Sequence, residues 1–199
     1  MLLESLNLNN KKKIQQYNIK LKIKQNIPNT ITLMRLLVLP CLIYSFNHHN
    51  TLATIALFLV SIGTDFLDGF VARKISFTSK FGAYLDVIVD FFFISGMYLT
   101  FILNEIYSPL ILVVIIFVFI QFIVSNIFLK QTIYDPIGKY FGSFLFAGIG
   151  LTILFSDALI STSSIFSNQL IYNIITTIIV IFALVSLLSR IIYLLRLRK

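Results

Sequence analysis

The chain has 199 residues, of which 58% are apolar and only 12% are charged. A soluble globular domain carries about 25% charged residues, so this composition excludes an ordinary soluble domain and is typical of an integral membrane protein. Sixteen lysine and arginine residues against eight acidic ones give a net charge of +8, and the single cysteine excludes a disulfide scaffold.

The first 27 residues are rich in lysine. Apolar residues such as Ile14, Leu21 and Ile23 are interleaved with these lysines. This pattern predicts a basic helix that lies on the anionic inner leaflet of the membrane, and the alternative is a disordered basic tail that only sets topology. We therefore expect a juxtamembrane segment over residues 1–27 and one membrane domain over residues 28–199.

Six apolar stretches with short connections follow this segment. A helix needs roughly 20 apolar residues to cross the hydrocarbon layer of a bilayer. The sequence therefore predicts an all-α polytopic membrane protein with six transmembrane helices. The stretches cover approximately residues 31–47, 52–73, 82–103, 108–129, 139–160 and 170–194.

The basic residues predict how these helices are oriented. In the six-helix arrangement all 16 lysines and arginines fall on one side, and the three opposite loops contain none. Lysine and arginine in short loops stay in the cytoplasm. We therefore expect an integral protein of the cell membrane whose two termini face the cytoplasm.

Four aspartates lie in or beside the second and third stretches. Asp65 and Asp68 are three residues apart, and Asp86 and Asp90 are four apart, so each pair lies on one face of its helix. The short connection between these helices makes them antiparallel neighbours, which brings the pairs together near the cytosolic surface. Four converging carboxylates predict a site for Mg²⁺ or Mn²⁺, and for two ions rather than one.

The alternative interpretation of this cluster is a set of structural ion pairs. Arg73, Lys74 and Lys80 lie in the connection and could neutralise three of the four aspartates. Such pairs would form at the membrane surface and would not require the regular helical spacing of the acids. The metal site therefore remains the favoured interpretation.

Glycines and one arginine extend the same helix faces. Gly69 follows Asp65 by four residues and Arg73 follows Gly69 by four, while Gly82 precedes Asp86 by four. Glycine lets a ligand approach the backbone closely, and the planar guanidinium of arginine suits phosphate oxygens. Together with a metal site, these residues predict a diphosphate-binding site at the membrane surface.

Written out, residues 65–90 read D-F-L-D-G-F-V-A-R, eight residues, G, three residues, D, three residues, D. This segment resembles the signature of the CDP-alcohol phosphatidyltransferase family, whose six-helix membrane fold also agrees with the expected number of helices. The resemblance covers the chain from about residue 26 onward. The signature positions present are Asp65, Asp68, Gly69, Ala72, Arg73, Gly82, Asp86 and Asp90.

The resemblance implies an enzyme of phospholipid synthesis. Such enzymes transfer a phosphatidyl group from a CDP-linked lipid, such as CDP-diacylglycerol, to a small alcohol and release CMP. By this resemblance Asp65 and Asp86 bridge two metal ions, while Asp68 binds one ion and Asp90 binds the other. Asp90 is also the expected general base for the acceptor hydroxyl. The expected contacts to the CDP-lipid come from Gly69, Arg73, Ser79 and Gly82.

Residues 26–40, N-I-P-N-T-I-T-L-M-R-L-L-V-L-P, resemble the start of phosphatidylglycerophosphate synthases and their cardiolipin-synthase relatives. This resemblance implies that Asn29 and Thr30 lie near the nucleotide and that the acceptor is glycerol 3-phosphate. Phe91 follows Asp90 where those synthases usually have lysine. Serine, inositol phosphate or phosphatidylglycerol therefore remain alternative acceptors.

An anionic acceptor requires basic residues on the cytosolic side. Lys130, Lys139 and Arg190 are the candidates, and the alternative for each is a topology signal at a helix end. The net positive charge fits an enzyme that draws anionic substrates to membrane lipids, and it does not indicate nucleic-acid binding.

Small residues in the fifth stretch predict a close helix contact. Gly138 and Gly142 form a GxxxG motif that is followed by Gly148 and Gly150. Packing within the chain is the favoured interpretation, and a homodimer surface or space for a substrate are the alternatives.

Two other classes of protein remain as rivals. An intramembrane prenyltransferase also binds a diphosphate through aspartates, but generally has two separate acidic motifs. A cation transporter would need acidic residues near the middle of the membrane, whereas the four aspartates of this chain are expected near the cytosolic surface.

Overall fold

The computed structural model describes residues 30, 32–75, 80–129, 138–156 and 165–197. The predicted juxtamembrane segment, residues 1–27, lies outside this part. Some residues within the helices are described by their backbone alone, and these are residues 65, 68–75, 80, 81, 83, 125–129, 138, 139, 165–168 and 193–197.

The described residues form six helices and no strand, which confirms the all-α prediction. Each helix coincides with one of the apolar stretches. The N-terminal helix runs over Thr32–Asn47, and the others are α2 (Thr51–Ile75), α3 (Lys80–Leu103), α4 (Leu110–Leu129), α5 (Gly138–Ser156) and α6 (Ile165–Leu197).

Two helical segments are long and apolar enough to cross a membrane unaided, namely Tyr84–Leu103 in α3 and Gln169–Ile192 in α6. This is a finding of length and composition, so the six-span topology stays a prediction for the whole chain. The apolar segments of the other described helices are shorter, and these are Thr32–Asn47, Thr51–Thr64, Leu110–Val124 and Tyr140–Ser156.

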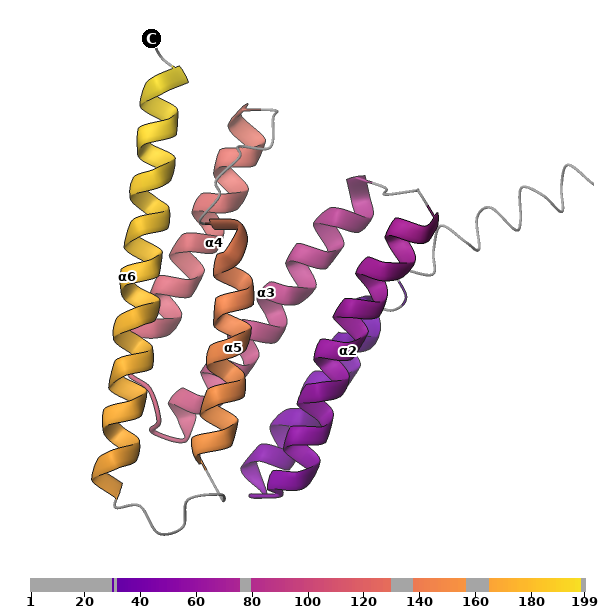
Figure 1. Cartoon of the computed structure of the whole chain (residues 1–199), viewed down its shortest axis with the longest axis vertical. Coiled ribbons are helices and arrows are strands. Elements are labelled where there is room, and N and C mark those ends of the chain that lie inside the picture. The colour runs from indigo at the N-terminus through magenta and orange to yellow at the C-terminus, as the bar shows by residue number, and fades with distance from the viewer. Residues whose placement is uncertain (1–29, 31, 76–79, 130–137, 157–164, 198–199) are drawn as a thin grey trace, which may run out of the picture.

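The helices run alternately up and down the bundle (Figure 1). The C-terminal ends of α2, α4 and α6 lie at its upper end, together with the N-terminal ends of α3 and α5. Large apolar side chains such as Leu37, Leu52 and Leu103 are exposed on the outside of the bundle. A lipid environment would cover these apolar surfaces, so the exposure pattern agrees with a membrane protein.

A tight turn joins the N-terminal helix to α2. The side-chain oxygen of Asn50 accepts a hydrogen bond from the backbone N–H of Ala53 at 3.2 Å and so caps α2. The carbonyl oxygen of Asn50 accepts hydrogen bonds from the hydroxyls of Thr54 at 2.8 Å and Ser45 at 3.1 Å. These bonds hold the two helices as a hairpin at the end of the bundle opposite the C-terminal end of α2 (Figure 1).

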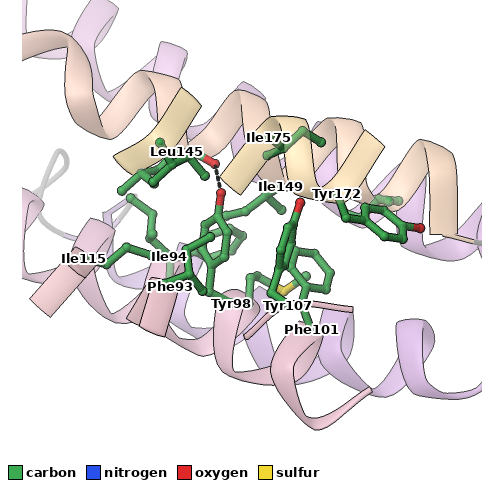
Figure 2. Packing of buried hydrophobic residues seen from close by; sticks show 14 of the residues in the cluster. Phe93, Ile94, Tyr98, Phe101, Tyr107, Ile115, Leu145, Ile149, Tyr172 and Ile175 are labelled. Atoms are coloured by element: carbon green, nitrogen blue, oxygen red, sulfur yellow. Dashed lines mark hydrogen bonds between the residues drawn. The ribbon is translucent and has the colours of Figure 1, made fainter. Parts of the chain in front are cut away.

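Most of the core lies between α3, α4, α5 and α6, and the N-terminal helix and α2 contribute further buried side chains (Figure 2). Phe93 and Phe101 of α3 are fully buried there, as is Ile149 of α5. The hydroxyl of Tyr107 bonds to Thr152 Oγ1 at 2.7 Å, and Thr152 donates to the carbonyl oxygen of Gly148 at 2.7 Å. Because Thr152 has one hydroxyl proton, Tyr107 is the donor to Thr152.

Two of the glycines in α5 pack against other helices of the same chain. Gly148 lies against Tyr98 of α3, and Gly150 lies against Phe58 of α2, whereas a Cβ atom at Gly142 would meet nothing within 4 Å. The predicted packing within the chain is therefore confirmed for Gly148 and Gly150. The homodimer surface stays a prediction.

Candidate active site

Asp86 and Asp90 lie one turn apart near the N-terminal end of α3. Their side chains are 42% and 32% exposed, so a ligand can reach both. The spacing of four residues puts both carboxylates on the same face of the helix. The spacing on α3 is therefore as the sequence predicts, and the role of the two aspartates as metal ligands stays a prediction.

An arginine from another helix contacts both of these aspartates. Arg35 lies in the N-terminal helix and its side chain is fully buried. Its NH1 group donates a hydrogen bond to Asp90 Oδ1, and the same nitrogen lies 3.8 Å from Asp86 Oδ1. A buried positive charge therefore lies beside the half-exposed acidic pair.

Sequence reasoning missed Arg35 as a site residue and counted it only among the basic residues that set topology. One signal could have identified it. Arg35 is a charged residue inside an apolar stretch, and such a residue is costly unless it has a partner or a function. Its partner is 55 residues away in the sequence, so local spacing gave no indication of the pair.

The second acidic pair lies on α2. The helix is continuous from Thr51 to Ile75, so Asp65 and Asp68 share one face of it. The side chains of Asp65, Asp68 and Arg73 and the surroundings of Gly69 are outside the described part of the structure. Convergence of the four aspartates therefore stays a prediction, although the C-terminal end of α2 and the N-terminal end of α3 lie at the same end of the bundle (Figure 1).

The donor chemistry of the described residues fits a hard divalent cation. A carboxylate has two oxygens and can accept several hydrogen bonds or metal contacts, so the bond from Arg35 leaves Asp90 chemically able to bind a metal as well. The part of the chain with described side chains contains no group of three or more potential metal ligands. Asp65 and Asp68 are therefore needed to complete the predicted set.

The residues expected to bind the CDP-lipid are only partly described. Thr30 is exposed at the start of the N-terminal helix, and Gly82 is partly exposed on α3, one turn before Asp86. Asn29 and Ser79 lie outside the described residues. The positions of Thr30 and Gly82 leave both accessible to a ligand.

Among the candidates for the acceptor site, only Arg190 has a described side chain. Lys130 lies outside the described residues, and the side chain of Lys139 is not described. Arg190 is 4% exposed, and its guanidinium carbon lies 5.1 Å from the ring centroid of Phe122 in α4. Ser186, one turn earlier on α6, is fully buried. Arg190 is therefore enclosed between α4 and α6, unlike a solvated charge at a helix end.

A family model matches most of the chain. Residues 25–196 match the family model described as CDP-alcohol phosphatidyltransferase. This range includes Arg35, the four aspartates and every other residue predicted for the site. No solved structure gives a significant match.

Several curated proteins are similar in sequence. The CDP-diacylglycerol--glycerol-3-phosphate 3-phosphatidyltransferase of Aquifex aeolicus is 31% identical over 163 residues, which cover 81% of this chain and 91% of that protein. The enzyme of the same name from Rickettsia felis is 38% identical over 73 residues, covering 35% of this chain and 40% of that protein. The Pseudomonas fluorescens enzyme of this name is 38% identical over 68 residues, covering 33% and 35%.

Proposed function

The chain belongs to the CDP-alcohol phosphatidyltransferase family, and we propose that it transfers the phosphatidyl group of CDP-diacylglycerol to glycerol 3-phosphate. As a member of this family it is a transferase of phospholipid synthesis. The observation that carries the proposed acceptor is the similarity to the Aquifex aeolicus enzyme over 91% of that protein, because the acceptor is part of that enzyme's name.

The proposed reaction is a substitution at phosphorus. The acceptor hydroxyl oxygen forms a bond to the phosphorus that carries the diacylglycerol. The bond from this phosphorus to the bridging oxygen breaks, and CMP leaves with the electron pair. Asp90 takes the proton of the hydroxyl, a role that suits a carboxylate exposed enough to reach a substrate.

The four aspartates are the proposed ligands of two divalent ions, Mg²⁺ or Mn²⁺. When bound, such ions would offset the negative charge of the diphosphate and of the leaving CMP. Asp65 and Asp86 would serve both ions, while Asp68 would serve one of them and Asp90 the other. The half-exposed pair on α3 supports this assignment for Asp86 and Asp90.

The nucleotide part of the donor is proposed to lie along the ends of the N-terminal helix, α2 and α3. The exposure of Thr30 and Gly82 supports their part in this assignment. The other residues are assigned by the family signature and the start of the chain's membrane domain. The proposed set is Asn29, Thr30, Gly69, Arg73, Ser79 and Gly82.

Arg190 is proposed to bind the phosphate of glycerol 3-phosphate, with Lys130 and Lys139 as further candidates. Its contact with the Phe122 ring supports this role, because it restricts the orientation of the guanidinium, and Arg190 keeps a small exposed surface that Arg35 lacks. Serine carries no phosphate, so a serine acceptor would leave Arg190 without this function. Inositol phosphate carries a phosphate, so Arg190 would keep its function with that acceptor.

An assay of CMP release tests the proposal. The purified protein in detergent receives CDP-diacylglycerol, Mg²⁺ and one acceptor: glycerol 3-phosphate, serine, inositol phosphate or phosphatidylglycerol. We expect CMP with glycerol 3-phosphate and its loss when EDTA removes the metal. CMP with another acceptor only would contradict the proposed acceptor, and no CMP with any of the four would contradict the activity.

The proposed topology has six spans, with both termini and the active site in the cytoplasm. Cys41 is changed to serine, and single cysteines are introduced as His48→Cys and Tyr140→Cys at exposed positions near opposite ends of the bundle. In intact cells an impermeant maleimide should label only the His48→Cys protein. Labelling of the Tyr140→Cys protein before lysis would contradict this orientation.

A further inference from the structure

The contact between Arg35 and the acidic pair joins two separate helices. NH1 of Arg35 bonds to Asp90 and also lies 3.8 Å from Asp86, so one nitrogen faces both carboxylates. Arg35 is completely buried, whereas the aspartates are partly exposed. The guanidinium therefore approaches the acidic pair from the interior, and the accessible part of the carboxylates is left to a ligand.

A buried arginine is stable only when its charge is compensated. Removing such a charge from water is unfavourable, and a nearby carboxylate in good geometry offsets that cost. Arg35 therefore cannot leave Asp90 easily, and Asp90 cannot change its side-chain rotamer without losing this bond. The contact restricts the orientation of the carboxylate before any substrate or metal arrives.

We propose that Arg35 is a positioning residue, whose guanidinium orients Asp90 and Asp86 for the binding of a divalent cation. This inference rests on the proposed function of the two aspartates. Groups that hydrogen-bond to metal ligands fix the orientation of those ligands, and their loss typically costs about 10–100-fold in metal affinity or activity. Arg35 performs this role from a different helix, so the N-terminal helix contributes to the acidic site.

The burial of Arg35 separates this role from direct binding of substrate. A side chain with no exposed surface does not meet the donor or the acceptor unless the helices move. Its effect therefore passes through the aspartates. Lysine at this position would retain the charge, but its single ammonium group lacks the planar fork of arginine and would orient the carboxylates less well.

The decisive experiment measures Mn²⁺ binding to the full-length protein in detergent, with free Mn²⁺ followed by electron paramagnetic resonance. We expect Arg35→Lys to weaken Mn²⁺ binding about 10-fold and to lower kcat about 10–100-fold, with the KM for CDP-diacylglycerol unchanged. Met34→Leu changes the adjacent, exposed residue and should match the parent protein in both measurements. Arg190→Lys changes another buried arginine and should leave Mn²⁺ binding unchanged.

Each other outcome has a defined meaning. Unchanged Mn²⁺ binding and kcat in Arg35→Lys, with a lower melting temperature alone, would show a purely structural residue and overturn the proposal. A raised KM for CDP-diacylglycerol with unchanged kcat would indicate direct binding of the donor and also overturn it. If Arg35→Lys does not fold, the charge-balanced pair Arg35→Gln with Asp90→Asn is compared with Asp90→Asn alone, and weaker Mn²⁺ binding in the pair supports the proposal while equal binding overturns it.

The two proposals fail separately. If the parent protein releases no CMP but Arg35→Lys weakens Mn²⁺ binding, the positioning role stands and the proposed reaction fails. If the parent protein releases CMP and Arg35→Lys binds Mn²⁺ as the parent does, the reaction stands and the positioning role fails.

Discussion

The hydroxyl oxygen of Tyr98 lies beside Gly148, only 2.6 Å from the point where any other residue would place its Cβ atom. Tyr98 is fully buried, and its hydroxyl donates a hydrogen bond to the carbonyl oxygen of Leu145 at 3.3 Å (Figure 2). The ring therefore cannot move aside without breaking this bond and disturbing the core. The glycine permits the close approach of α3 and α5.

We predict that Gly148→Ala destabilises the protein, although alanine is the better helix former by about 1 kcal/mol. Overpacking a well-packed core costs about 1–3 kcal/mol, which offsets or exceeds that gain. The matched control is Gly142→Ala in the same helix, where a Cβ atom meets nothing within 4 Å. Thermal unfolding in detergent should give a lower melting temperature for Gly148→Ala than for Gly142→Ala, and the reverse order would contradict the packing.

A second variant tests whether the hydroxyl of Tyr98 is the cause. We predict that Tyr98→Phe recovers part of the stability lost in Gly148→Ala, because it removes the atom that the new Cβ would meet. The two single variants and the double variant form a cycle whose coupling energy is measured by thermal unfolding. Additive effects within about 0.5 kcal/mol would show that the two sites do not interact in this way.

The helices could be predicted from the sequence because their apolar runs are long and have few charges, and the spacing of Asp86 and Asp90 places both on one face of α3. Contacts between helices could not be predicted in the same way. Arg35 and Asp90 are 55 residues apart, and their pairing depends on how the N-terminal helix packs against α3. Likewise, the glycine pattern of α5 indicates a close contact but does not identify Tyr98 as the neighbour, because a partner helix from a second copy would produce the same pattern.

We predict that Asp90→Asn lowers the rate of CMP release by about 10²–10⁴-fold, the usual contribution of a general base. The amide of asparagine can still accept a hydrogen bond from Arg35, and Asp86 remains 3.8 Å from the same nitrogen, so the fold should persist. Circular dichroism and size-exclusion chromatography check the fold, and the assay with CDP-diacylglycerol and glycerol 3-phosphate measures the rate. Full activity in a folded Asp90→Asn protein would exclude the proposed base.

We predict that Arg190→Gln raises the KM for glycerol 3-phosphate about 10–100-fold, since a hydrogen bond to a charged group contributes about 1.5–3 kcal/mol. The KM for CDP-diacylglycerol should stay the same, because Arg190 is assigned to the acceptor alone. Leu188→Ile, an exposed position on the same helix, is the control and should match the parent protein. A raised KM for the donor instead of the acceptor would contradict the assignment.

We predict that Tyr107 makes the free energy of unfolding fall at high pH. It lies in the connection between α3 and α4, where burial raises its pKa to about 12. In the unfolded chain a tyrosine ionises with a pKa of about 10. Above that pH the unfolded state loses the proton while the folded state retains it, so the free energy of unfolding falls between about pH 10 and pH 12, by up to about 1.4 kcal/mol per pH unit. Thermal unfolding between pH 9 and pH 11 should show a smaller decline in Tyr107→Phe than in the parent protein, and an identical decline in both would show that Tyr107 does not remain protonated in the folded state.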